Sequence, residues 1–156
     1  MTIQISQKPL EILLIEDNPG DVRLTVEGFR ETKAFNKLNV AYDGEEAMAF
    51  LRREGKFKKA PRPDLILLDL NLPKKDGREV LEEIKDDRDL KCIPVVILTT
   101  SHSIDDIEET YSNHANCYIT KPVDLNQFVK VVKSIDDFWL NIVKLPNKET
   151  GDYNGG

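Results

Sequence analysis

The chain has 156 residues, 40% of them hydrophobic, which suits one domain with a proper core and leaves little for a second. Its 28 acidic and 22 basic residues give a net charge of −6, which argues against nucleic acid or an anionic membrane as the main partner, because both bind cationic surfaces. Cys92 and Cys117 have no metal-binding or disulfide spacing, and no apolar run approaches the roughly 20 residues of a membrane span, so we expect a cytoplasmic protein.

Strand-like and helix-like segments alternate along the chain. The apolar runs that predict strands are 10–16, 38–42, 65–69, 94–99 and 116–120. The segments with helical spacing of apolar residues are 17–31, 43–54, 77–87, 103–111 and 124–145. This alternation predicts an α/β fold in which a parallel sheet carries helices on both faces.

Parallel strands end at a common edge, where ligands of open α/β sheets bind, so the residues that end each strand are the candidate site. The first strand ends in Glu16 and Asp17, the third in Asp69, the fourth in Thr99 and the fifth in Lys121. Three neighbouring carboxylates need a cation, and an oxygen-only ligand set suits Mg²⁺. With a hydroxyl and an ammonium nearby, Asp69 could act as a nucleophile that forms an acyl phosphate.

Each of these signals is weak alone. An acidic pair after a strand more often caps a helix, and a carboxylate at a strand end is as often a solvated terminus as a reactive group. Their order and spacing together are specific. The segments "LLIEDNPGD", "DLILLDLNLPKKDG", "PVVILTTS" and "CYITKP" resemble the receiver domain of two-component response regulators over about residues 9–143.

The resemblance implies a doubly wound five-stranded parallel sheet in the flavodoxin-like order 2-1-3-4-5, with five helices and an extended last helix. It implies that Asp69 is the phosphoacceptor. It also implies that Mg²⁺ is held by Glu16, Asp17, Asp69 and the backbone carbonyl of Asn71. The corresponding domain division is an N-terminal extension (1–8), a receiver domain (9–145) and a disordered polar tail (146–156).

The same resemblance assigns the residues that respond to phosphorylation. Thr99 matches the switch hydroxyl, Tyr118 the aromatic that turns inward with it, and Lys121 the lysine that pairs with phosphate. Pro122 matches a proline that follows a cis peptide bond. Two departures, Glu16 in place of an aspartate and Cys117 in place of a frequent glycine, leave the charge pattern of the site intact.

A closer resemblance concerns the partner. The loop "REGKFKKAPRP" before the third strand, "LTTSHSIDDI" and the ending "FWLNIVKLP" are similar to the small response regulators of cyanobacterial phytochromes. This implies a phytochrome-type histidine kinase as phosphoryl donor. The tail after Leu145 is too short to fold, so we expect output through the receiver surface to an unknown downstream protein, without a DNA-binding output domain.

Other functions fit these residues less well. Phosphatases of the haloacid dehalogenase type also place a nucleophilic aspartate at a strand end, but they need a second aspartate where this chain has Asn71. A flavin or nucleotide binder would need a glycine- or hydroxyl-rich phosphate loop instead of "EDNPGD". The remaining alternative is a phosphate-independent adaptor with the receiver fold. We therefore expect a phosphoacceptor signalling domain and no enzyme.

The last predicted helix has more apolar surface than one sheet can cover. At about 100° per residue, its apolar arc spans about 200°, whereas a helix lying on a sheet needs only about 100°. Val131, Phe138 and Leu145, spaced by sevens, extend the arc on one side. Self-association would cover this surface, and the phytochrome-linked regulators that the chain resembles are dimeric. The alternative is that the polar tail folds back over the helix.

We therefore predict a homodimer through the last helix. Sedimentation should show a dimer at micromolar concentration without phosphorylation, and Phe138→Asp should give a folded monomer because a charge at the interface would be buried without a partner. A wild-type chain that stays monomeric at high concentration would contradict the prediction.

Overall fold

The structure, a computed structural model, describes residues 10–30, 36–99 and 117–120. Within them one sheet contains five strands, namely β1 (Leu10–Ile15), β2 (Asn36–Ala41), β3 (Leu65–Asp69), β4 (Val95–Thr99) and β5 (Cys117–Thr120). The strands lie in the order β2-β1-β3-β4-β5, and every neighbouring pair is parallel. The predicted doubly wound sheet and its strand order are confirmed.

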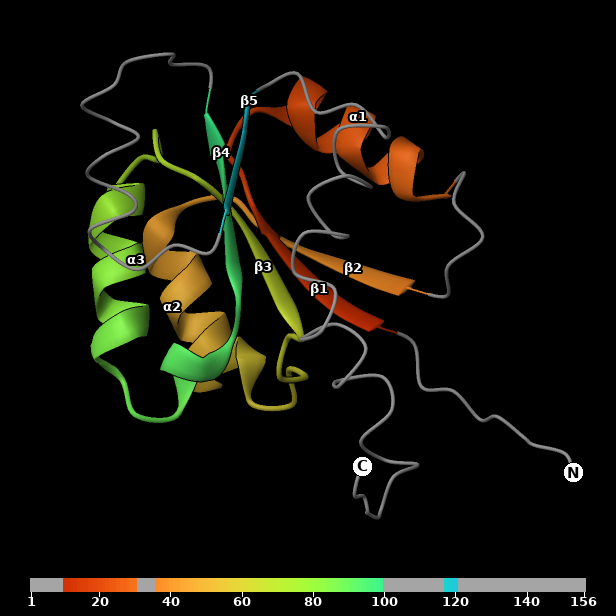
Figure 1. The fold of residues 1–156 in the computed structure, drawn as a ribbon. Helices are drawn as coiled ribbons and strands as arrows, with labels where there is room; N and C mark the ends of the chain where they lie inside the picture. Colours follow the sequence, from red (N-terminus) through yellow and green to blue (C-terminus); the bar gives the residue numbers. More distant parts are fainter. Residues whose placement is uncertain (1–9, 31–35, 100–116, 121–156) are drawn as a thin grey trace, which may run out of the picture.

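Helices cover both faces of the sheet (Figure 1). Helix α1 (Pro19–Arg30) lies on one face, and α2 (Gly44–Arg52) and α3 (Gly77–Asp86) lie on the other. Short 3-10 turns, η1 (Gly55–Phe57) and η2 (Leu90–Cys92), precede β3 and β4. The helices predicted at 103–111 and 124–145 lie outside the described residues. Among the helices that the structure does describe, none is long and apolar enough to cross a membrane.

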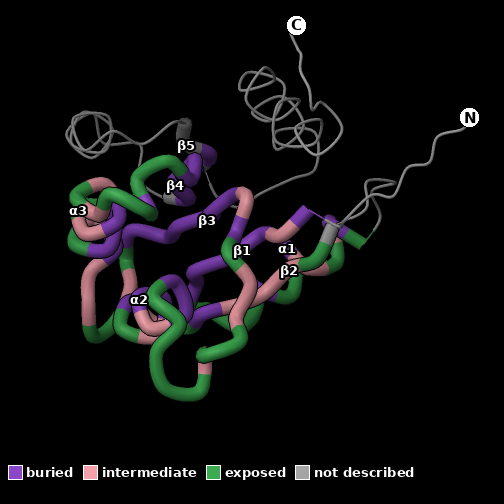
Figure 2. Tube along the Cα trace, turned by 90° about the horizontal axis from the view of Figure 1, so that it is seen from below, coloured by how far each residue is buried: buried purple, intermediate pink, exposed green. Residues whose placement is uncertain are grey.

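The alternation of side chains along the strands produces two apolar layers. The layer under α2 and α3 contains the strand residues Leu13, Ile15, Ala41, Ile66, Leu68, Val95 and Ile97. The layer under α1 contains Leu10, Ile12, Leu14, Leu65, Leu67, Val96, Leu98 and Ile119. Each fully buried Leu or Ile side chain contributes about 1.5–3 kcal/mol to the free energy of unfolding. Figure 2 shows the buried residues concentrated along the strands.

Strand β3 is central to this arrangement, since all five of its residues are buried. It lies between β1 and β4 and receives α1 on one face and α2 and α3 on the other. A strand covered on both faces has to be a continuous apolar run, which is why Leu65–Leu68 was recognisable in the sequence. The carboxylate of Asp69 therefore stands at the end of a strand that is buried along its whole length.

Helix α2 is shorter than the predicted 43–54. It ends at Arg52, because Arg53 adopts a left-handed conformation (φ 58°) and terminates the helical hydrogen bonding. The N–H groups of Arg53 and Glu54 donate to the carbonyls of Phe50 (3.2 Å) and Ala49 (2.9 Å). The sequence "LRRE" contains no glycine that would have marked this end.

Helix α3 begins with a reciprocal cap. The Asp76 carboxylate accepts the Arg78 N–H (3.0 Å), and the Glu79 carboxylate accepts the Asp76 N–H (3.1 Å). This capping box satisfies backbone donors that the first helical turn leaves without partners. It fixes where the chain that leaves Asp69 enters its next helix.

Replacing the cap should destabilise the domain measurably. Asp76→Ala should lower the free energy of unfolding by about 1 kcal/mol, the usual effect of losing an N-cap carboxylate. The matched control is Asp86→Ala, which removes an exposed carboxylate from the last turn of the same helix, where a negative charge has no stabilising role. Urea denaturation of both variants checks this, and equal midpoints would contradict the assigned role of Asp76.

Candidate functional site

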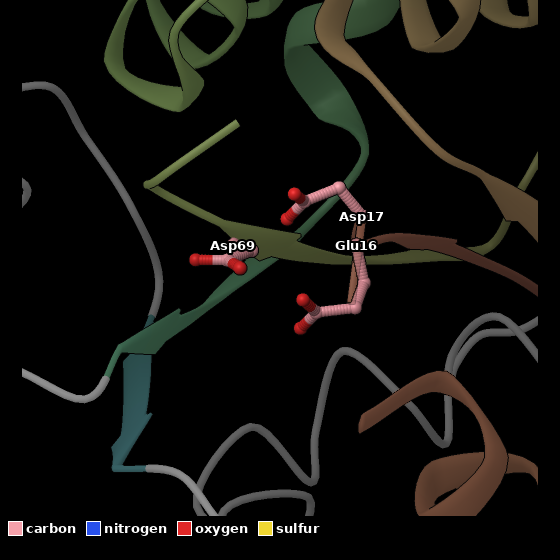
Figure 3. Close-up of side chains that lie close together, drawn as sticks. All are labelled: Glu16, Asp17 and Asp69. Carbon is pink, nitrogen blue, oxygen red and sulfur yellow. The ribbon is translucent and has the colours of Figure 1, made fainter. Parts of the chain in front are cut away.

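Three carboxylates meet at the carboxyl ends of β1 and β3. Glu16 and Asp17 follow β1 directly, and Asp69 ends β3. One oxygen of each carboxylate lies within 4.8 Å of the other two, and Figure 3 shows the three side chains gathered at the strand ends. The structure brings together the three side chains that were expected to meet, while their role as metal ligands stays a prediction.

Two of these carboxylates are buried. Glu16 is 1% exposed and Asp69 is 3% exposed, whereas Asp17 is exposed. Glu16 accepts the N–H of Asn18 (3.2 Å), and Oδ1 of Asp69 accepts the N–H of Asn71 (3.0 Å). Backbone donors thus orient both buried carboxylates.

The close approach of these carboxylates is electrostatically unfavourable when they are ionised. Two unit charges about 4–5 Å apart repel by roughly 3–4 kcal/mol at an effective dielectric constant of about 20. Water screens the pairs that include exposed Asp17 more strongly than the pair formed by Glu16 and Asp69. A bound cation would remove this repulsion.

The chemistry of the donors fits a hard divalent cation. The cluster contains carboxylate oxygens and neither histidine nor cysteine. Mg²⁺ is bound by a few carboxylates, keeps some of its waters and recruits phosphate oxygens. The site therefore has the composition expected for Mg²⁺ bound beside a phosphoryl group.

Asn71 lies in the loop that joins β3 to α3, residues 70–76, which we call the β3–α3 loop. Its side chain is exposed, and its N–H is used by Asp69. The expected fourth ligand is the Asn71 backbone carbonyl, which the same hydrogen bond keeps close to the carboxylate cluster. The N–H of Gly77 donates to the Leu70 carbonyl (3.0 Å) and closes the loop at its other end.

The two switch residues lie on neighbouring strands. Thr99 ends β4 and pairs with Thr120, and Tyr118 lies on β5 opposite Ile97. Leu98 pairs with Asp69, so Thr99 stands one position beyond the end of β3. The structure describes the backbone of Thr99 and Tyr118, and their functions remain expectations.

Other expected site residues lie outside the described residues. These are Lys121, which follows the last described residue of β5, and Pro122. The same holds for the dimer-interface residues Val131, Phe138 and Leu145.

Two glycines near the site received no function from the sequence. Gly44 and Gly77 are the first residues of α2 and α3, and each follows an aspartate that caps its helix. Both are buried against the β3–α3 loop, where an added Cβ would clash with backbone atoms. The repeated Asp-Gly at these two helix starts was the available signal, but it reads equally well as ordinary helix capping.

A charged side chain of the loop is also tied to two helices. The Lys75 ammonium donates a hydrogen bond to the Glu83 carboxylate, which also pairs with Arg52 (3.3 Å). The hydrogen bond to Glu83 raises the pKa of Lys75 above its ordinary value. The contact between Lys75 and Glu83 therefore contributes its full stabilisation when the pH is below the ordinary pKa of lysine. The stabilisation is lost only as the pH rises through the raised pKa of Lys75. The tie is therefore present throughout the neutral range.

The fold and the carboxylate cluster define a class of protein. Residues 12–133 match the response regulator receiver domain family. The chain belongs to this family, whose members are signalling domains of two-component systems that bind a divalent metal.

The similarity to particular relatives covers almost the whole chain. Response regulator Rcp1 of Synechocystis sp. is 52% identical over 141 residues, which are 90% of this chain and 96% of Rcp1. The phosphorylated cyanobacterial phytochrome response regulator RcpA is 53% identical in its crystal structure, with a TM-score of 0.74 over 86% of this chain and 96% of RcpA. The Mn²⁺-bound form of Rcp1 is 52% identical, with a TM-score of 0.73 over 86% of this chain and 97% of Rcp1. The protein is thus a receiver-domain response regulator similar to Rcp1 and RcpA.

Replacing the exposed carboxylate separates metal binding from folding. Asp17→Asn should weaken Mg²⁺ binding by at least about tenfold, since even the loss of an outer-shell partner has that effect. In metal-free buffer the variant should be at least as stable as wild type, because one of three mutually repelling charges is gone. Calorimetric Mg²⁺ titration and urea denaturation in EDTA measure the two effects.

A suitable control is Glu82→Gln, which removes an exposed carboxylate on α3 away from the cluster and should leave Mg²⁺ binding unchanged. A clear loss of metal-free stability in Asp17→Asn would assign that residue a structural capping role instead.

Proposed function

We propose that this protein accepts a phosphoryl group from a histidine kinase on Asp69, in a Mg²⁺-dependent reaction, and signals through its receiver surface. The observation that supports this most strongly is the cluster of Glu16, Asp17 and Asp69 at adjacent strand ends. Asp69 is the natural acceptor because it ends the central strand and its carboxylate is already oriented by the Asn71 N–H.

The proposed transfer requires little chemistry from the protein beyond positioning. A carboxylate oxygen of Asp69 forms a bond to phosphorus as the phosphorus–nitrogen bond of the donor phosphohistidine breaks, which leaves an acyl phosphate on Asp69. When bound, Mg²⁺ supplies positive charge to the carboxylates and to the oxygens of the transferred group. Glu16 and Asp17 would hold the metal, and the burial of Asp69 limits the access of water.

Signalling would follow from residues at the ends of β4 and β5. Thr99 is the proposed hydroxyl that moves toward the phosphoryl group, Tyr118 the aromatic that repacks with it, and Lys121 the cation that pairs with phosphate. A two-state element of this kind is biased by the added charge and exposes a different surface to a downstream protein.

A phytochrome-type histidine kinase is the proposed donor. The support is the identity above 50% to Rcp1 and RcpA, since RcpA is itself a cyanobacterial phytochrome response regulator. We also propose a homodimer through the apolar arc of residues 125–145, for which the support is the sequence pattern described above.

The acceptor assignment is tested by phosphorylation of matched variants. With Mg²⁺ and acetyl phosphate, or with a phosphorylated phytochrome-type kinase, the wild type should acquire an acid-stable but hydroxylamine-labile label, as an acyl phosphate does. Asp69→Asn should acquire none, because an amide is not a nucleophile toward phosphorus, and EDTA should abolish labelling of the wild type.

Asp86→Asn is the control and should be labelled like the wild type, since its carboxylate is exposed at the far end of α3. Equal labelling of Asp69→Asn and wild type would show that another residue accepts the phosphoryl group.

A further inference from the structure

The β3–α3 loop carries the backbone carbonyl of Asn71, and close backbone contacts hold the loop at two places. At its far end, Gly77 approaches the end of β3 so closely that a Cβ there would lie 2.4 Å from the Asp69 carbonyl oxygen and 2.5 Å from the Leu70 Cα. Those neighbours are backbone atoms of a buried strand end, which cannot move aside as the tip of a side chain would. The start of α3 is thus fixed directly against the acceptor residue.

The second contact comes from the first residue of α2, a helix that covers one face of the sheet (Figure 1) and is distant from the loop in sequence. The Gly44 N–H donates to the Pro73 carbonyl (3.4 Å). A Cβ at Gly44 would lie 2.1 Å from the Lys75 carbonyl oxygen and 2.7 Å from its Cβ. Two backbones therefore pack against each other with no room for a methyl group.

Backbone conformation does not require glycine at this position. The φ angle of Gly44 lies outside the left-handed region, so any residue could adopt it. Glycine is a poor helix former relative to alanine, so its presence in α2 is unfavourable for the helix alone. The close approach to the loop is what excludes alanine.

A side chain of the loop reinforces this contact. Lys74 has a left-handed backbone (φ 66°), which is unusual for a residue with a side chain. Its ammonium pairs with Oδ2 of Asp43 (3.6 Å), while Oδ1 of Asp43 caps α2 by accepting the Glu46 N–H (2.7 Å). One carboxylate thus joins the loop to the first turn of α2.

From these contacts we propose that the start of α2, Asp43 and Gly44, is a positioning element for the metal site, acting through the β3–α3 loop. The inference rests on the proposed function, because it concerns the Asn71 carbonyl as a metal ligand. Few residues separate Asn71 from Lys75, and the Lys75 N–H donates to the Pro73 carbonyl (2.7 Å), which makes this stretch a tight turn. A displacement forced on Lys75 is therefore passed to Asn71 and to its hydrogen bond with Asp69.

The test compares two substitutions in the same helix. Gly44→Ala inserts a methyl group against Lys75, whereas Ala47→Gly weakens the interior of α2 and adds no atom that could push on the loop. Gly44→Ala should raise the Kd for Mg²⁺ by about tenfold or more, the size of effect seen when support for a metal ligand is lost. Ala47→Gly should lower the Tm and leave the Kd unchanged. Gly28→Ala on α1, where a Cβ meets nothing within 4 Å, should leave the Kd unchanged and raise the Tm slightly, because alanine is the better helix former.

A second readout does not depend on metal. In metal-free buffer, the amide resonances of Asn71 and Gly77 should shift in Gly44→Ala and stay in place in Ala47→Gly. If wild type bound no Mg²⁺, the proposed function would fail, yet these shifts would still show whether Gly44 positions the loop. Equal Kd values for Gly44→Ala and Ala47→Gly, or unchanged Asn71 and Gly77 amides, would overturn the inference.

If Gly44→Ala does not fold, Asp43→Asn and Lys74→Gln decide the question. Asparagine retains the helix cap, so each variant removes only one charge of the link. If the two residues acted on the metal through their charge alone, Asp43→Asn would weaken Mg²⁺ binding and Lys74→Gln would strengthen it, because Asp43 attracts a cation and Lys74 repels it. A positioning role predicts weaker binding in both. Opposite shifts would overturn the inference.

Discussion

The repulsion between the carboxylates at the ends of β1 and β3 is the constraint on which the site depends. It follows from the packing of the sheet, because Ile15 pairs with Leu68 and the chain then continues directly into Glu16 and Asp69. The apolar layers on both faces fix this register, since a shift by one residue would turn buried side chains to the opposite face. Hydrophobic burial thus holds like charges at a distance that they would not adopt alone, and a cluster of this composition favours a divalent cation.

The loop after Asp69 positions backbone groups beside these carboxylates. The carbonyl of Leu70, the first residue of the loop, accepts the Gly77 N–H, and the Asn71 N–H donates to the Asp69 carboxylate. Lys75 reaches α3 and, through Glu83, the last turn of α2. A structural change at Asp69 therefore acts on a loop that is already in contact with two helices. These contacts connect α2 and α3 to the site.

Much of the fold was predictable because buried parallel strands must be continuous apolar runs, as in Leu65–Leu68, and because helices on a sheet show regular apolar spacing. The gathering of Glu16, Asp17 and Asp69 was predictable for a related reason, since parallel strands end at one edge. The early end of α2 was missed, because Arg53 takes a left-handed conformation that ordinarily favours glycine. The packing of Gly44 against Lys75 was also missed, because a contact between distant backbones leaves only a glycine in the sequence and no spacing rule to find it.

The central claim is that a divalent cation binds among these three carboxylates, and paramagnetic broadening by Mn²⁺ tests it most directly. Substoichiometric Mn²⁺ should broaden the backbone amide resonances of residues near the cluster, chiefly Asp17, Leu70 and Asn71, and excess Mg²⁺ should reverse the broadening. The effect should be weak at exposed acidic residues elsewhere, such as Glu45 on α2 and Glu82 on α3. Broadening centred on those residues, or broadening that Mg²⁺ does not reverse, would contradict the account.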